Sequence, residues 1–502
     1  MKENEISQSM GSTLNQLFEN PVVQLISVLL LFAVLSFSKL GTTGLAVWDD
    51  GYYAQKAKEI LLSGDWINIH YNGNPKFDNP PLFMWFQALS YKIWGINEYA
   101  AKFPSAVFGT LSILLLYLFG SELKDKNYGF LSALILALTQ PFVRYSRRGM
   151  IDVTLTFFVL AALYFAWKGT AKDKRWFFLW ALACGMSILL KSVLGGFPLI
   201  IVICWLILNK QREVLFSWEF ILSIVLIFII GGWWYLIEII KWGQQFINLH
   251  FGWLIWARGF IRQEDSGHWW EHLSYLRDLL KYYWPWLPLA VLGLWYAFKN
   301  WFRGKDKSFN SLTLIWFLAY ILVLSIMNAR RIWYIMPVFP VLALFVAERL
   351  YVWIKSGKPY TDLAKGVFFL FLMSVGIINF FPLEIDKVRS LEVRQISPYV
   401  RYYAKREAKV LAYNLDYYGL NNALLFYSDC GATICRTETQ IKGEILNGER
   451  VTCLVERGEY SKWTDGMKKT FKLVKQAGPL CYLTTGELLP DTLQIQSKPY
   501  IR

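Results

Sequence analysis

The fold class follows from one apolar segment, residues 216–240, whose sequence is FSWEFILSIVLIFIIGGWWYLIEII. Only Glu219 and Glu238 place a charge in it. An α-helix needs about 20 mostly apolar residues to cross the hydrocarbon layer of a membrane. The segment therefore predicts a membrane-spanning helix rather than the core of a soluble domain.

Ten other apolar segments make the protein polytopic. The eleven predicted spans are residues 22–39, 102–120, 128–143, 152–168, 175–190, 194–209, 216–240, 284–300, 311–327, 332–353 and 364–382. The 502 residues are 55% hydrophobic and only 18% charged, whereas soluble domains carry about 25% charged residues. This composition excludes a disordered chain, collagen and a small disulfide scaffold. We expect a mainly α polytopic membrane protein with about eleven transmembrane helices.

The basic residues of the short loops predict the orientation, because cytoplasmic loops carry an excess of Lys and Arg. With the N-terminus in the cytoplasm, the inside loops hold 15 such residues and the opposite short loops hold six. An odd number of spans then places the C-terminal segment outside the cytoplasm. The net charge of +15 indicates contact with anionic lipid headgroups, not nucleic acid.

Two domains are expected. Residues 1–389 form the transmembrane domain, with long outer loops at 40–101 and 241–283. Residues 390–502 form a small extracytoplasmic α/β domain, with strand-like runs at Val410–Tyr413, Ala423–Tyr427, Val451–Val455 and Cys481–Thr484. This domain also holds four cysteines, which either form two disulfides or stay as free thiols. They are Cys430, Cys435, Cys453 and Cys481.

Carboxylates gather in the outer loops. Asp49 and Asp50 follow the first span, and Tyr53 is close behind them. Asp78 precedes a Pro-Pro pair that begins a predicted interfacial helix over Leu82–Trp94, and Asp152 stands directly before an apolar run. Charges held at a membrane face are functional candidates, but an aspartate at a helix start is also an ordinary N-cap.

Six basic residues fall in the short loops predicted to lie outside the cytoplasm, where the charge rule expects few Lys and Arg. They are Arg144, Arg147, Arg148, Lys191, Arg330 and Arg331. Together with three carboxylates they suit a substrate with an anionic head and an apolar tail. The alternative is that these side chains only extend to lipid headgroups.

All four histidines also fall in outer loops, at His70, His250, His268 and His272. His268 and His272 are four residues apart, so they would share one helix face, where a distant carboxylate could complete a zinc site. The weak metal candidates are Asp50, Asp78, His250, His268 and His272. The alternative is hydrogen bonding at the interface, and no cofactor is required by the sequence.

Motifs in this order resemble the GT-C integral-membrane glycosyltransferases. They are Trp48–Ala54, Gly64–Ile67, Phe77–Leu82, Arg147–Phe158, Leu190–Lys191 near Gly195–Gly196, and Arg330–Pro337. The resemblance covers roughly residues 40–345. The branch in question contains bacterial aminoarabinose–lipid A transferases and protein O-mannosyltransferases.

The resemblance implies that Asp49 acts in catalysis and that Asp152 is the second-loop aspartate near the substrates. It implies that Arg147, Lys191 and Arg330 or Arg331 hold the phosphate of a polyprenyl-phosphate sugar donor. Asp50, Tyr53 and Asp78 would line the substrate loop. The chain has Asn79 where the aminoarabinose branch has a phosphate-binding lysine.

The mechanism expected from these catalytic residues is a single inverting displacement in which Asp49 is the general base and Asp152 is a second, positioning carboxylate. We expect the acceptor to be an envelope lipid, glycan or protein, and the protein to lie in the bacterial inner membrane. A divalent metal could bind Asp49 and Asp50. A transporter or lipid flippase and a non-catalytic scaffold are the alternatives, although transporters usually place ionisable groups near the bilayer midplane.

Overall fold

The computed structural model describes residues 16–17, 19–45, 49–257, 259, 273–328, 330–354, 357–380, 390–406, 408–415, 417–446 and 450–488. The chain forms two compact units, each assembled from separate segments. The first unit consists of Met1–Ser38, Phe77–Phe83 and Ser105–Leu383, and the second of Lys39–Lys76, Met84–Pro104 and Glu384–Arg502.

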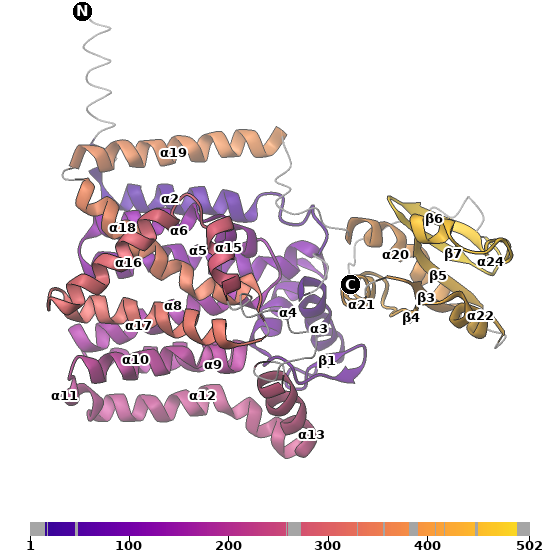
Figure 1. The fold of residues 1–502 in the computed structure, drawn as a ribbon, viewed down its shortest axis with the longest axis horizontal. Helices are drawn as coiled ribbons and strands as arrows, with labels where there is room; N and C mark the ends of the chain where they lie inside the picture. The colour runs from indigo at the N-terminus through magenta and orange to yellow at the C-terminus, as the bar shows by residue number, and fades with distance from the viewer. Residues whose placement is uncertain are drawn as a thin grey trace, which may run out of the picture. The chain divides into compact units, whose positions relative to one another are not determined.

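The first unit is a bundle of apolar helices that run alongside one another (Figure 1). Its helices are α2 (Pro21–Phe37), most of α5 (Glu98–Leu123), α6 (Lys126–Ala137), α7 (Gln140–Ser146), α8 (Ile151–Ala171), α9 (Trp176–Gly195), α10 (Phe197–Leu208), α11 (Arg212–Leu215), α12 (Trp218–Trp242), α13 (Gln244–Phe246), η1 (Ile247–Ala257), α15 (Ser274–Tyr282), α16 (Leu287–Phe302), α17 (Lys307–Ile326), η3 (Ile332–Val338), α18 (Phe339–Trp353) and α19 (Gly357–Phe380). Helix α8 packs on α9, and α9 packs on α12.

Six helices of the described residues are long and apolar enough to cross a membrane. They are α5, α8, α9, α12, α17 and the combined segment Ile332–Trp353. Helices α2 and α10 are apolar but shorter. The prediction of a mainly α polytopic membrane protein is confirmed at this level, and the count of eleven spans stays a prediction.

The predicted span 128–143 is not a single helix. Helix α6 ends at Ala137 and α7 begins at Gln140, with Pro141 in its first turn. A proline ring clashes with the carbonyl four residues earlier and has no N–H to donate. That carbonyl belongs to Ala137, so Pro141 accounts for the break.

The second unit contains a mixed five-stranded sheet in the order β4-β3-β5-β7-β6. The strands are β3 (Lys409–Tyr413), β4 (Thr433–Cys435), β5 (Val451–Glu456), β6 (Lys472–Ala477) and β7 (Leu480–Thr484). Strand β3 pairs in parallel with β4 and β5, while β7 pairs antiparallel with β5 and β6. The predicted small C-terminal α/β domain is therefore confirmed.

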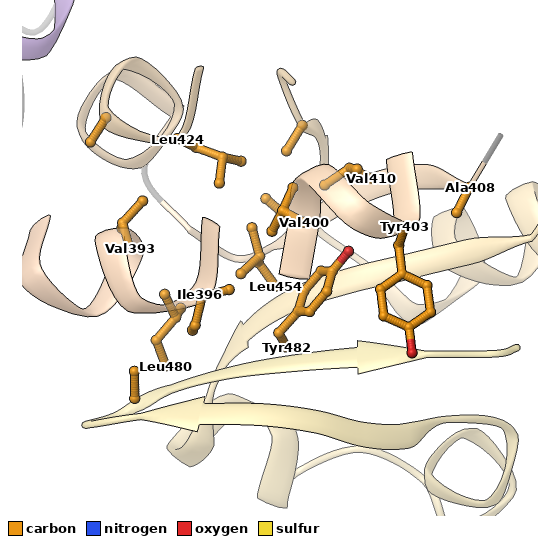
Figure 2. Close-up of a cluster of buried hydrophobic side chains, with 14 residues drawn as sticks. Val393, Ile396, Val400, Tyr403, Ala408, Val410, Leu424, Leu454, Leu480 and Tyr482 are labelled. Atoms are coloured by element: carbon orange, nitrogen blue, oxygen red, sulfur yellow. The ribbon is translucent and has the colours of Figure 1, made fainter. Parts of the chain in front are cut away.

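Helices cover both faces of this sheet. The remaining elements of the unit are α3 (Asp49–Ser63), β1 (His70–Tyr71), β2 (Asn74–Pro75), α4 (Leu82–Trp94), α20 (Ser390–Ala404), α21 (Tyr417–Ser428), α22 (Glu438–Leu446), α23 (Arg457–Ser461) and α24 (Asp465–Thr470). Figure 2 shows Val393, Ile396 and Val400 of α20 facing Leu454 and Tyr482 of the sheet.

The opposite face of the sheet holds a second apolar cluster that includes three of the cysteines. Cys435, Cys453 and Cys481 pack there with Trp463 and Met467. All six cysteines of the chain are free, so the free-thiol alternative describes this structure.

One predicted strand was wrong. Residues Ala423–Tyr427 lie inside helix α21. A short apolar run cannot be distinguished from a buried helix segment by periodicity alone. Here Ala423 and Leu424 are buried against the sheet domain as part of one helix face.

Candidate active site

A buried ion pair joins two neighbouring helices of the first unit. The Nζ atom of Lys191 lies 2.6 Å from Oδ1 of Asp152. Asp152 is buried in the first turn of α8, whose N-cap position is taken by Met150. The N-cap alternative for Asp152 is therefore wrong, and its carboxylate contacts a lysine 39 residues away.

Lys191 reaches Asp152 because α9 is broken there. The φ/ψ angles are −154°/69° at Lys191 and 16°/−105° at Ser192, and helical geometry resumes after them. The break brings the backbone of Gly195 against that of Ser187. A Cβ atom at position 195 would lie 1.9 Å from the Ser187 carbonyl oxygen, so only glycine fits.

An aromatic ring from a third element completes this cluster. The Lys191 ammonium lies 4.1 Å from the centroid of the Tyr334 ring, in η3. An ammonium over an aromatic face is attracted by the ring quadrupole. Tyr334 is uncharged, and the only signal for it in the sequence is its place in the motif that follows Arg330 and Arg331.

The first unit also contains a cluster in which basic side chains contact aromatic rings. The guanidinium of Arg331 lies 6.0 Å from the centroid of the Trp333 ring, and that ring lies 6.0 Å from the ring of Tyr145. Arg148 and Arg144 lie 5.2 and 5.9 Å from the Tyr145 ring. We call these five residues the basic-aromatic cluster. Arg144 and Arg148 were noted for their charge but were not selected as site residues.

Arg147 occupies a different environment from its neighbour Arg148. Its guanidinium donates to the carbonyls of Leu35 at 2.6 Å, Ser36 at 3.4 Å and Ser38 at 2.8 Å. These carbonyls belong to the C-terminal end of α2, where a cation is favoured by the helix dipole. Arg147 therefore stabilises a helix end in this structure, and its contact with phosphate stays a prediction.

Arg330 and Arg331 differ in their surroundings as well. The Nε of Arg330 donates to the Met327 carbonyl at 2.8 Å. Arg331 is exposed, and its backbone N–H donates to the hydroxyl of Tyr275 at 3.3 Å. Of the two, Arg331 presents the more accessible guanidinium.

The first-loop carboxylates belong to the second unit. Asp49 and Asp50 stand inside the first turn of α3, where the helix dipole favours negative charge. Asp49 is half-buried, while Asp50 and Tyr53 are buried. The side chain of Lys102 holds the preceding loop, because its ammonium donates to the Thr43 carbonyl at 2.7 Å and the Gly44 carbonyl at 2.9 Å.

Helix α21 packs against α3. A Cβ atom on Gly51 would lie 3.1 Å from the backbone of Asn422, so the two helices are in close contact. Lys58 forms a 2.5 Å ion pair with Asp429 and donates to the Phe426 carbonyl at 2.7 Å. The position of Asp49 within this unit thus depends on residues more than 350 positions further along the chain.

The metal candidates do not form a cluster in the described residues. No group of three His, Cys, Asp or Glu side chains there is arranged to hold a metal ion. Asp78 is half-buried, one residue after Phe77, whose carbonyl is bonded to Nδ1 of His250. His268 and His272 lie outside the described residues.

Comparison with known proteins gives a match to a family model over part of the chain. Residues 78–235 match the family model of the dolichyl-phosphate-mannose-protein mannosyltransferases. This match, together with the likeness in fold to ArnT given below, bears out the resemblance to the GT-C membrane glycosyltransferases seen in the motifs.

Two individual proteins are similar to this chain in sequence. The chain is 29% identical to an uncharacterized protein of Aquifex aeolicus strain VF5, over 64% of this chain and 63% of that protein. It is 28% identical to undecaprenyl phosphate-α-4-amino-4-deoxy-L-arabinose arabinosyl transferase 2 of Pseudomonas fluorescens strain Pf0-1, over 64% of this chain and 58% of the relative. The matched part thus spans less than two thirds of these curated relatives.

Solved structures show the same fold at lower identity. The crystal structure of ArnT from Cupriavidus metallidurans bound to undecaprenyl phosphate matches with a TM-score of 0.72 at 17% identity, covering 93% of this chain and 99% of that one. The oligosaccharyltransferase AglB of Archaeoglobus fulgidus matches with a TM-score of 0.57 at 14% identity, covering 91% and 74%.

Proposed function

We propose that the protein is a membrane glycosyltransferase that moves a pentosyl or hexosyl group from a polyprenyl-phosphate donor to an envelope lipid, glycan or protein. The observation that carries this proposal is the buried Asp152–Lys191 pair, with Tyr334 beside it and the basic-aromatic cluster in the same unit. Cations on apolar helices suit a phosphate head attached to an isoprenoid tail. The similarity to a polyprenyl-phosphate-dependent arabinosyl transferase supports the same donor class.

The phosphate ligands in this proposal are Lys191 and Arg331, with Arg330 and Arg147 as further candidates. A guanidinium binds two phosphate oxygens through its planar fork, and an ammonium acts as a point charge. Both stabilise the negative charge that develops on the departing phosphate. Because Asp152 holds Lys191 by its ammonium, we assign Asp152 as a positioning carboxylate.

Asp49 is the proposed general base. The acceptor oxygen attacks the anomeric carbon while the bond from that carbon to the phosphate oxygen breaks. The electron pair of the breaking bond stays on the polyprenyl phosphate, and the acceptor proton passes to Asp49. Attack opposite the leaving group inverts the anomeric centre. Asp50, Tyr53 and Asp78 are proposed to line the substrate loop.

The topology belongs to the same proposal. Eleven spans, a cytoplasmic N-terminus and an extracytoplasmic domain at residues 390–502 would place the chemistry on the outer face of a bacterial inner membrane. The distribution of basic residues between the loops supports this arrangement.

A donor-release assay tests the function. The protein is reconstituted in lipid nanodiscs with a radiolabelled undecaprenyl-phosphate sugar and an envelope extract as acceptor. We expect the label to leave the polyprenyl lipid, with release of free undecaprenyl phosphate, and Asp49→Asn to prevent it. If a panel of pentosyl and hexosyl donors stays intact, or if the labelled donor only changes leaflet in vesicles, the transferase proposal fails and a flippase is favoured.

A further inference from the structure

The break in α9 is a place where backbone groups lose their helical partners, so other groups must satisfy them. Three hydroxyl groups do so. Tyr235 donates to the carbonyl of Ile188 at 3.1 Å, Tyr320 donates to that of Leu194 at 3.2 Å, and Ser187 donates to that of Gly195. The break is therefore built into the packed structure.

Ser192 connects this break to a buried histidine. Its Oγ lies 2.9 Å from Nε2 of His250 and 2.9 Å from the hydroxyl of Tyr235. The other ring nitrogen of His250, Nδ1, contacts the carbonyl oxygen of Phe77. A carbonyl oxygen only accepts, so Nδ1 carries the hydrogen and Nε2 is left to accept from Ser192.

The ring of His250 is fixed on its faces as well. It is fully buried and stacks on Phe246, with 5.1 Å between the centroids and 10° between the planes. Burial lowers the pKa of His250, against smaller opposing effects of the Phe77 carbonyl and the Asp78 carboxylate. A neutral ring with one donor and one acceptor agrees with the two contacts it makes.

The two partners of His250 are each adjacent to a predicted site residue. Ser192 follows Lys191, which pairs with Asp152, and Phe77 precedes Asp78. We propose that His250 is a positioning residue that holds, through Ser192, the break from which Lys191 reaches Asp152. This inference rests on the proposed function in one respect, namely that Lys191 binds the donor phosphate.

A metal ligand is the competing role for His250. In this structure both ring nitrogens face protein oxygens, one a hydroxyl and the other a carbonyl. Neither nitrogen has a lone pair directed at a cluster of ligands among the described residues. The hydrogen-bonding role therefore fits the observed contacts, and the experiment below includes the metal role as an outcome.

The test measures binding of undecaprenyl phosphate to the full-length protein in nanodiscs. Ser192→Ala removes one hydroxyl, and His250→Phe keeps a ring that can stack on Phe246 but removes both hydrogen bonds. Each change should weaken binding about tenfold, the effect of losing roughly 1.4 kcal/mol from a buried hydrogen bond. His250→Gln, which retains a donor and an acceptor, should recover part of the affinity. Ser223→Ala is the matched control, since Ser223 is a buried serine on a different helix, α12.

Two double mutants distinguish an effect of His250 on the position of Lys191 from an independent loss of packing. Ser192→Ala combined with His250→Phe should be no worse than the more damaging single mutant. On a Lys191→Ala background, His250→Phe should have no further effect on the dissociation constant. Additive losses in either pair would overturn the inference, because His250 would then act independently of Ser192 or Lys191.

Failure of this inference can be distinguished from failure of the proposed function. If Lys191→Ala weakens binding and neither Ser192→Ala nor His250→Phe does, His250 is not a positioning residue and the phosphate role of Lys191 stands. If Lys191→Ala has no effect, the phosphate role itself is wrong. Loss of binding with a chelator, restored by Zn²⁺ in the wild type but not in His250→Phe, would instead make His250 a metal ligand. Should His250→Phe fail to fold, Ser192→Ala and its double mutant with Lys191→Ala carry the test.

Discussion

Asp49 has the residue-scale role that is easiest to isolate. Asp49→Asn keeps the size of the side chain and removes the base, so turnover should fall by roughly 10²–10⁴-fold. Binding of undecaprenyl phosphate should be unchanged, because the variant keeps every proposed phosphate ligand. Turnover is measured by donor release, with Asp173→Asn as the control at an exposed loop position. Retention of more than about a tenth of the activity would exclude Asp49 as the base.

Arg331 allows the phosphate role to be tested without disturbing a buried ion pair. It is exposed beside Trp333, so Arg331→Ala should leave thermal stability nearly unchanged. Its loss should weaken binding of undecaprenyl phosphate by about five- to tenfold, as expected for one partly hydrated charge-assisted contact. Arg277→Ala, whose side chain is 77% exposed, is the matched control. Equal affinity in the two variants would indicate that Arg331 only contacts lipid headgroups.

At the scale of elements, the broken helix α9 offers a matched pair of glycines. Gly195→Ala places a Cβ atom 1.9 Å from the Ser187 carbonyl, whereas the nearest atom to a Cβ at Gly196 is 3.4 Å away. We expect Gly195→Ala to destabilise the protein by more than about 3 kcal/mol or to prevent its recovery, because a backbone atom cannot move aside cheaply. Gly196→Ala should change stability by less than about 1 kcal/mol. Thermal unfolding in detergent compares the two, and similar melting temperatures would contradict this geometry.

The contact between α3 and α21 predicts a pH dependence. Burial lowers the pKa of Lys58, against the opposing effects of its hydrogen bond and ion pair with Asp429. The unfolded lysine keeps its proton up to about pH 10.4, so the folded state binds fewer protons between its lowered pKa and that value. The stability of the wild type relative to Lys58→Met should therefore rise with pH through this window. Unfolding of both proteins from pH 7 to pH 10 measures it, and a constant difference would show that the ion pair cancels the burial effect.

At the scale of the whole molecule, the loop charges predict the topology. A reporter active only outside the cytoplasm should be active when fused after Arg502 and inactive when fused after Lys172. The reason is the excess of basic residues in the loops assigned to the cytoplasm. The opposite pattern would overturn both the eleven-span arrangement and the outer-face reaction. A fusion after Lys210, which is predicted to lie on the same side as Lys172, is the internal control.

The surroundings of the candidate site residues could be predicted from the sequence to different degrees. Asp152 and Lys191 were each selected because a charge at the end of an apolar run is costly. Their contact could not be predicted, since it requires both the packing of α8 on α9 and the break after Leu190. Arg147 and Arg148 are identical in type and adjacent, yet one binds the end of α2 and the other faces Tyr145. Sequence has no local signal that separates such neighbours.

Elements were predicted best where one property dominates. Long apolar runs identify membrane helices because backbone groups in lipid must be bonded within the segment. The error at residues 423–427 arose in the second unit, where a five-residue apolar run suits a strand or a helix face equally. Pro141 explains why residues 128–143 form two helices rather than one. The predicted span was based on length and hydropathy, and neither property reveals a break at a proline.

The sequence by itself determined that this is a helical membrane protein with a small α/β domain, and that its charged loop motifs resemble those of the GT-C transferases. Those properties depend on composition, run length and local motifs, which each segment carries alone. Only the tertiary structure decided that Lys191 pairs with Asp152, that His250 bonds Ser192 and Phe77, and that α21 supports α3. These contacts join residues from 39 to 371 positions apart. They depend on how helices pack, and packing is a property of the folded chain as a whole.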